Sequence, residues 1–302
     1  MARKRGYARE RLFQSVESVL AIAVIIGVIA LIYDVLTGGR GLDVVYISSN
    51  WVRYLSAVQI NLSATTISFF LGMGLGFLVG WVRTVRSPPI QKVLRDFREA
   101  EKEGSARGKS ALAATIVNAG FRHYVRRVAD AYVETIRGTP LFVQIIFAYT
   151  VMQVALPRVP GGVEFIAALV ALTINTGGYQ GEIFRAGLQT VHSGQVEAAR
   201  AMGLSRWGAM RFVILPQALR LVIPPLTNEY IGLFKASALL YYISVLEITF
   251  LSKQEAYRGH PFESFALISG IFLLITVTLS KVVQYFEVKY RIPGLGLQAA
   301  PG

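Results

Sequence analysis

The chain has 302 residues, of which 53% are hydrophobic and 16% are charged, and its mean hydropathy is +0.48. Soluble globular domains carry about 25% charged residues, so this composition indicates a membrane protein. The 31 Lys and Arg outnumber the 18 Asp and Glu, giving a net charge of +13, and the lack of cysteine excludes disulfides and thiolate metal sites.

Six apolar stretches are long enough to cross a bilayer as helices, which takes about 20 apolar residues. They predict an all-α membrane protein with six transmembrane helices. No small-x-small cleavage site follows the first stretch, so we expect an uncleaved anchor helix there rather than a signal peptide. The stretches are residues 16–36, 56–82, 139–156, 163–181, 221–250 and 262–286.

Basic residues are distributed unevenly over the segments between these stretches. The N-terminal tail, the 83–137 loop, the 185–220 loop and the C-terminal tail hold 5, 12, 5 and 3 Lys or Arg, whereas the opposite-side segments hold five in total. The positive-inside rule then places both termini and both large loops in the cytoplasm. This distribution accounts for the positive charge without nucleic acid.

The second stretch carries glycines every four residues. Gly72, Gly76 and Gly80 form one stripe, which predicts close packing against another membrane helix. Asn61, Thr65 and Ser68 continue this stripe, and two readings stay open for them. They either join helices by hydrogen bonds or line a transport path.

The first large loop contains a strongly charged segment. Residues 84–110 include "REAEKEGSARGKS" and few large apolar groups, so we expect this part to be mobile or surface-lying rather than packed. The motif "GSARGKS" resembles a phosphate-binding loop, but it has three residues instead of four between its glycines and no strand before it. We therefore expect no ATPase in this chain, and we find no nucleophile–base pair that would make it an enzyme.

The fifth stretch contains ionisable residues, which are costly in a membrane and usually face a cavity or a partner. Asn228, Lys235 and Tyr242 are spaced by seven and share a face of an unbroken helix. Pro224-Pro225 would break or kink its start. Lys235 is either a structural partner of Glu229 or another helix, or a residue of the transport path. The candidate path residues are Asn61, Thr65, Asn228, Glu229, Lys235, Ser237 and Tyr242.

Residues 197–216, "EAARAMGLSRWGAMRFVILP", permit three interpretations. Two short helices joined at Gly203 resemble a DNA-binding helix-turn-helix, but the second offers only Arg206 and Arg211 among large apolar side chains. A plain connector with Gly203 as a helix C-cap and Ser205 as an N-cap also fits. Because long structured loops are usually functional, we favour a two-helix element that docks on a cytosolic partner.

Several motifs of this chain resemble the permease subunits of bacterial ABC importers. Glu197-Ala198-Ala199, Gly203 and Ile214-Leu215-Pro216 match their EAA signature in order and spacing. The segments "TIRGTPLFVQIIF", "GGYQGEIFRAGLQTVHSGQVEAARAMGLS" and "ILPQALRLVIPPLTNEYIGLFKASAL" are similar to the polar amino-acid branch of that family. Where this branch usually has a Lys-Asp-Thr-Ser-Leu-like run, residues 235–239 read "KASAL".

The resemblance implies a type I ABC importer permease fold, with one extra N-terminal helix, in the bacterial inner membrane. Implied partners are two ATP-binding subunits, a second permease subunit, identical or homologous, and a solute-binding protein that delivers an amino acid. ATP and Mg²⁺ would be held by the ATP-binding subunits, and this chain would carry no cofactor. A secondary transporter or channel is the alternative, but it leaves the EAA loop unexplained.

The resemblance also implies a division of the chain. Residues 1–54 form a tail, the extra helix and an external loop, 55–290 form the permease domain, and 291–302 form a cytoplasmic tail. Within the permease domain, 84–124 is an insertion and 185–220 is the coupling loop. The coupling residues implied are Glu197, Ala198, Ala199, Gly203, Ser205, Arg206 and Pro216.

Overall fold

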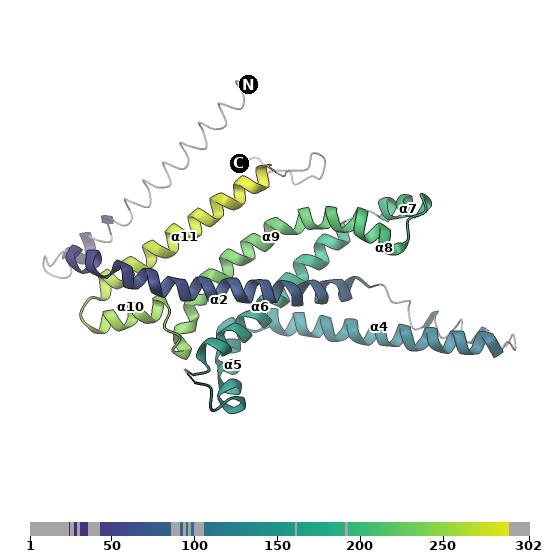
Figure 1. Ribbon diagram of the computed structural model, residues 1–302, viewed down its shortest axis with the longest axis horizontal. Coiled ribbons are helices and arrows are strands. Elements are labelled where there is room, and N and C mark those ends of the chain that lie inside the picture. Colours follow the sequence, from purple (N-terminus) through teal and green to yellow (C-terminus); the bar gives the residue numbers. More distant parts are fainter. Residues whose placement is uncertain are drawn as a thin grey trace, which may run out of the picture.

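The computed structural model describes residues 43–85, 106–160, 162–190 and 193–289, together with 31–35 and isolated positions within 24–28 and 91–99. Every secondary-structure element in these ranges is helical, which confirms the all-α prediction (Figure 1). Most of the predicted first span, most of segment 84–110 and the 291–302 tail lie outside the described residues. The elements are α2 (Val44–Thr84), α4 (Ala106–Gly138), α5 (Leu141–Ala155), α6 (Glu164–Thr190), α7 (Ser193–Ala201), α8 (Arg206–Ala209), η1 (Met210–Ile214), α9 (Leu215–Ala236), η2 (Ser237–Ile243), α10 (Ile248–Tyr257) and α11 (Pro261–Lys289).

Helices α2 and α6 form the centre of the molecule. The predicted glycine stripe of α2 faces α6, and a Cβ atom at Gly76 would lie only 2.8 Å from Cβ of Gln180 and 2.9 Å from the backbone nitrogen of Gly181. Glycine therefore lets the two backbones touch at this position. The prediction that this stripe packs against a membrane helix is confirmed.

The predicted third span is turned sharply away from the helix before it. Helix α4 ends at Gly138, α5 begins at Leu141, and their axes differ by 109°. Pro140 cannot donate a backbone hydrogen bond, so it ends the helical pattern. The side-chain amide of Gln144 holds the corner, because Nε2 donates to the carbonyls of Ile136 (2.8 Å) and Thr139 (3.2 Å).

The predicted fifth span is not one helix over 221–250. Helix α9 runs from Leu215 to Ala236 and continues as the 3-10 helix η2, after which Ser244 adopts a left-handed conformation with φ 63°. The prediction that Tyr242 shares a face of an unbroken helix with Asn228 was therefore wrong. The kink expected from Pro224-Pro225 is present, since the helical path bends by 47° near residue 220, where the prolines cannot donate to the preceding turn.

The described chain has two opposite ends. The turn between α10 and α11 lies beside the beginning of α2, whereas α7 and α8 lie near the other end of α2 (Figure 1). Two described helices are by themselves long and apolar enough to cross a membrane, α2 and the Pro261–Val283 part of α11. The predicted spans 139–156 and 163–181 correspond to α5 and to the first two thirds of α6.

Candidate functional site

The hook, α7 and α8 with the turn between them (residues 193–209), is shaped by its caps. Gly203 has φ +87° and ends α7, with its N–H donating to the carbonyl of Arg200 (3.0 Å). Leu204 N–H donates to the carbonyl of Ala199 (3.1 Å), which completes a Schellman motif. Oγ of Ser205 accepts from the N–H of Gly208 (3.0 Å) and caps α8. Both predicted caps are confirmed.

The hook presents an apolar surface to solvent. Met202 is 78% exposed and Trp207 is 63% exposed, and Phe212, in the first turn that follows, is 66% exposed. Large apolar side chains that are exposed together usually mark a protein–protein contact. Of the predicted coupling residues, Ala199 is buried, the side chain of Arg206 lies outside what the structure describes, and Glu197, Ala198, Gly203, Ser205 and Pro216 are exposed.

Three of the candidate path residues are buried between helices of this single chain. Asn61 Nδ2 donates to Oγ of Ser237 (2.8 Å) and to Oε2 of Glu247 (2.9 Å), while its Oδ1 accepts from the N–H of Ile248 (3.1 Å). Thr65 is also fully buried, and its hydroxyl has no hydrogen-bond partner among the described residues. Asn61 and Ser237 therefore join α2 to the break after α9.

The other candidate path residues lie at the surface of the chain or close to it. Glu229 accepts a hydrogen bond from the hydroxyl of Thr176 on α6 (3.0 Å) rather than pairing with Lys235. Lys235 is exposed and forms no ion pair with any described residue. Asn228 is exposed, and Tyr242 lies edge-on to Phe142 with ring centroids 4.7 Å apart. The structure therefore does not gather the seven candidates into one site.

A charge cluster near the hook was not anticipated from the sequence. Arg83, at the end of α2, pairs with Asp130 of α4 (2.7 Å) and Glu182 of α6 (2.6 Å), and Glu182 also pairs with Arg185. Glu182 follows the apolar stretch 163–181. Hydrogen bonds from Arg185 and Arg83 lower the pKa of its carboxyl to about 2. The four charges come from three helices, and only Glu182 and Arg185 have a local i,i+3 spacing, so the sequence could indicate that one pair but not the cluster.

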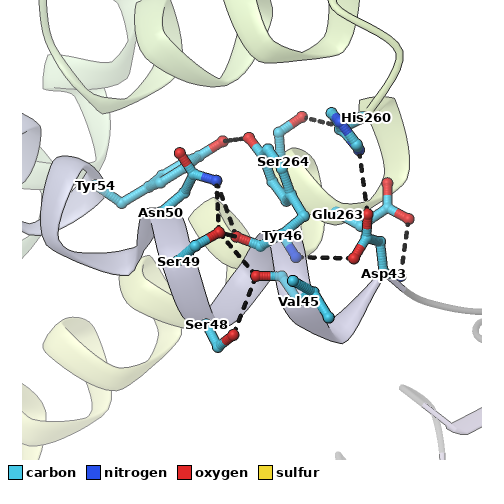
Figure 2. Close-up of polar contacts among 10 residues, drawn as sticks. All are labelled: Asp43, Val45, Tyr46, Ser48, Ser49, Asn50, Tyr54, His260, Glu263 and Ser264. Atoms are coloured by element: carbon cyan, nitrogen blue, oxygen red, sulfur yellow. Dashed lines mark hydrogen bonds and ion pairs between the residues drawn. The ribbon is translucent and has the colours of Figure 1, made fainter.

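A second polar cluster lies at the opposite end of the molecule (Figure 2). The hydroxyls of Tyr46 and Tyr54 are 3.1 Å apart, and the ring of His260 stacks on Tyr46 with centroids 4.2 Å apart. Asp43 caps α2 by accepting from the N–H of Tyr46, and its own N–H donates to Oε1 of Glu263 (3.3 Å). These contacts fasten the beginning of α2 to the beginning of α11.

Neither cluster has the form of a metal site. Within the described ranges, no three or more His, Asp or Glu side chains are arranged so that they could hold a metal ion. The charged groups are instead paired with one another across helix ends.

Long apolar helices, intramembrane polar residues and an exposed hook define a membrane-embedded transport subunit. The family model described as "Binding-protein-dependent transport system inner membrane component" matches residues 110–291. The chain belongs to this family.

Individual relatives agree with this assignment. The glutamine transport system permease protein GlnP of Escherichia coli K12 is 38% identical over 167 residues, which cover 55% of this chain and 75% of the relative. The nopaline transport system permease protein NocM of Agrobacterium fabrum C58 is 34% identical over 190 residues, covering 58% and 79%. A crystal structure described as an amino acid ABC transporter with histidines has a TM-score of 0.64 at 28% identity, covering 83% of this chain and all of the other.

Membership of this family decides between the functions considered from sequence. The chain is an ABC importer permease and not a secondary transporter or a channel that works without an ATPase. It is a transport subunit rather than an enzyme, because ATP hydrolysis is carried out by separate subunits in such importers. The family implies ATP-binding subunits and a substrate-binding protein as partners.

Proposed function

We propose that this chain is the membrane-spanning subunit of an importer for polar amino acids, delivered by a solute-binding protein. The observation that carries the proposal is the combination of the family match over residues 110–291 with relatives named for glutamine and nopaline transport. The amino acid ABC transporter structure aligns with this chain over its whole length, which supports the same substrate class.

The hook is the proposed docking site for an ATP-binding subunit. Its two caps hold Gly203 at the tip, where no other atom lies within 4 Å of the position of a Cβ atom, so a partner has free access. Exposed Met202 and Trp207 supply apolar contact area, and aromatic side chains are typical anchors of such interfaces. Glu197, Ala198, Ser205, Arg206 and Pro216 are proposed to complete this surface around the buried Ala199.

The transport path is proposed to follow the exposed polar residues of α9 and η2. Asn228, Lys235 and Tyr242 are exposed, and Glu229 is only partly buried, in the isolated chain. Polar groups at membrane depth that are open on one side are suited to a path between two permease subunits. For Asn61, Thr65 and Ser237 we propose the alternative role, which is to hold α2 against the broken end of α9.

The complete assembly is proposed to contain this chain, a second identical or homologous permease, two ATP-binding subunits with ATP and Mg²⁺, and the solute-binding protein. We propose six transmembrane helices in the bacterial inner membrane, with the extra one in residues 1–54 and the permease domain in 55–290. The distribution of Lys and Arg supports cytoplasmic termini and a cytoplasmic hook.

Uptake by the reconstituted complex tests this function. The whole complex is placed in proteoliposomes with its solute-binding protein, and radiolabelled amino acids, beginning with glutamine, are offered in turn. We expect ATP-dependent accumulation of at least one polar amino acid, and no accumulation with a non-hydrolysable ATP analogue or without the binding protein. Accumulation in the absence of the ATP-binding subunits would contradict the proposal.

A further inference from the structure

A pair of tryptophans joins the hook to helix α2. The ring of Trp207 in α8 lies 6.3 Å from the ring of Trp81, measured between centroids, with the planes inclined by 31°. In sequence the hook lies between α6 and η1, and α2 lies far from it along the chain. Helices α7 and α8 pack on each other and on η1 rather than on α2. Among the described residues, Trp207 and Trp81 form the ring contact between the hook and α2.

The ring contacts continue from α2 into α6. Trp81 lies edge-on to Phe77, with centroids 5.6 Å apart, and Phe77 lies edge-on to Phe184 of α6 at 5.5 Å. Beside these rings the helices touch, because a Cβ atom at Gly80 would be 2.8 Å from Cβ of Phe184. Close-packed rings and backbones are not compressible, so a displacement of Trp81 moves α2 and α6 together.

We propose that Trp81 is the positioning residue through which movement of the hook reaches the α2–α6 pair. The inference rests on the proposed function, in which an ATP-binding subunit moves the hook. The hook is joined to α9 by a continuous helical run, because α8, η1 and α9 follow one another without a gap, and its other end follows α6 along the chain. The contact of Trp207 with Trp81 adds a third point of attachment, so the hook cannot tilt without moving α2. Without the indole ring, movement of the hook still reaches α9 through the helix but is no longer passed to α2, so less amino acid is taken up for each ATP hydrolysed.

The test compares uptake with ATP hydrolysis in the whole reconstituted complex. Trp81→Ala is expected to lower the amount of amino acid taken up per ATP hydrolysed by about tenfold, while the ATP-binding subunit stays bound. Trp81→Phe keeps a ring at this position and is expected to restore most of the ratio. Trp51→Ala is the matched control, because Trp51 is exposed near the other end of the same helix.

The composition of the chain permits a direct measurement of the contact. The chain has three tryptophans and no cysteine, so Trp51→Phe leaves Trp81 and Trp207 as its only tryptophans, and Trp81→Cys with Trp207→Cys introduces the only thiols of this chain. We expect indole fluorescence to change when the complex binds ATP. The double cysteine variant should show the low ratio of uptake to hydrolysis expected for Trp81→Ala, and a bismaleimide cross-link between its two cysteines should restore part of that ratio, because it ties the hook to α2 again.

Three results are decisive. An unchanged ratio of uptake to hydrolysis in Trp81→Ala overturns the inference, and so does dissociation of the ATP-binding subunit, because the ring would then only build the docking surface. A cross-link that leaves the ratio of the double cysteine variant as low as before the reaction also overturns it. A wild-type complex that shows no ATP-dependent uptake instead refutes the proposed function, whatever Trp81 does.

Discussion

Gly203 holds a backbone conformation that other residues adopt only at a cost. Its φ of +87° is left-handed, which costs about 1–2 kcal/mol for a residue with a Cβ atom. Space is open around it, so a side chain there would point into the proposed docking surface. We expect Gly203→Asp to leave the membrane helices inserted and to abolish ATP-driven uptake through loss of the ATP-binding subunit, as measured by co-purification.

A second glycine of the same hook provides the control. Gly194 is exposed on α7, has no neighbouring atom within 4 Å of the position that a Cβ atom would take, and does not have a positive φ. Gly194→Asp should therefore keep both the subunit and transport. If the Gly203→Asp complex retains its ATP-binding subunit and transports normally, the hook is not the docking site.

Lys235 is an exposed cation in a helix proposed to border the transport path. Since it has no ion-pair partner among the described residues, its removal leaves no opposite charge uncompensated within this part of the chain. We expect Lys235→Ala to assemble at the wild-type level and to lose about tenfold or more of its uptake rate. Lys281→Ala, which removes an exposed cation from α11, is the comparison. Normal uptake by Lys235→Ala would remove this residue from the path.

Glu182 links two arginines, and its contribution to stability depends on pH. Its pKa is lowered to about 2, so the stabilisation is complete above the ordinary carboxyl pKa and is lost as the pH falls towards 2. We expect Glu182→Gln to unfold about 1–2 kcal/mol more easily at pH 7 and to differ less from the wild type at pH 3. Thermal unfolding of the purified subunit measures both values. Glu134→Gln, which alters an exposed side chain, should leave the stability unchanged at both pH values. A stability difference between Glu182→Gln and the wild type that is larger at pH 3 than at pH 7 would contradict the role of Glu182.

At the scale of elements, the contact between α2 and α6 depends on small residues at one face. Gly76→Val would place its side chain against Gln180 and the backbone of Gly181. We expect the two helices to separate, the stability to fall by about 1–3 kcal/mol and the folded yield to fall with it. Gly74 lies two residues away with open space around it, and Gly74→Val should be tolerated. Fluorescence-detected size exclusion compares the two variants. Equal yields would show that the helices do not touch.

The sequence predicted some elements well because their signals are local. Glycines spaced by four residues mark a packing face of a helix, whichever helix packs against it. Gly203 and Ser205 define the turn of the hook through local backbone conformation and capping. The break after Ala236 has no such signal, since "SALLYYI" is as apolar as the helix before it. The corner at Pro140 did have a local sequence signal, because the residue before a proline avoids the helical conformation.

The candidate site was less predictable than the fold because its contacts join distant parts of the chain. Asn61 lies 176 residues from Ser237 and 186 from Glu247, and only the packed structure shows that it binds both. Sequence spacing placed Asn61 and Ser237 with the path residues, since polarity in a membrane span indicates function without saying which way a side chain points.

At the scale of the whole molecule, we expect the two ends described above to face opposite sides of the membrane. The lack of cysteine makes this testable by single substitutions. In right-side-out vesicles, we expect a membrane-impermeant maleimide to label Tyr257→Cys directly, because Tyr257 is 82% exposed near the α10–α11 turn. Met202→Cys in the hook should be labelled only after permeabilisation. The reverse pattern would invert the proposed orientation.

The corner between α4 and α5 also shows how the chain satisfies backbone groups that a broken helix leaves free. A broken helix frees carbonyl groups, and in many membrane proteins water satisfies them. Here the amide of Gln144 takes that place by donating to the carbonyls of Ile136 and Thr139. A single glutamine thus lets the chain change direction by 109° at this corner without leaving these two backbone carbonyls unpaired.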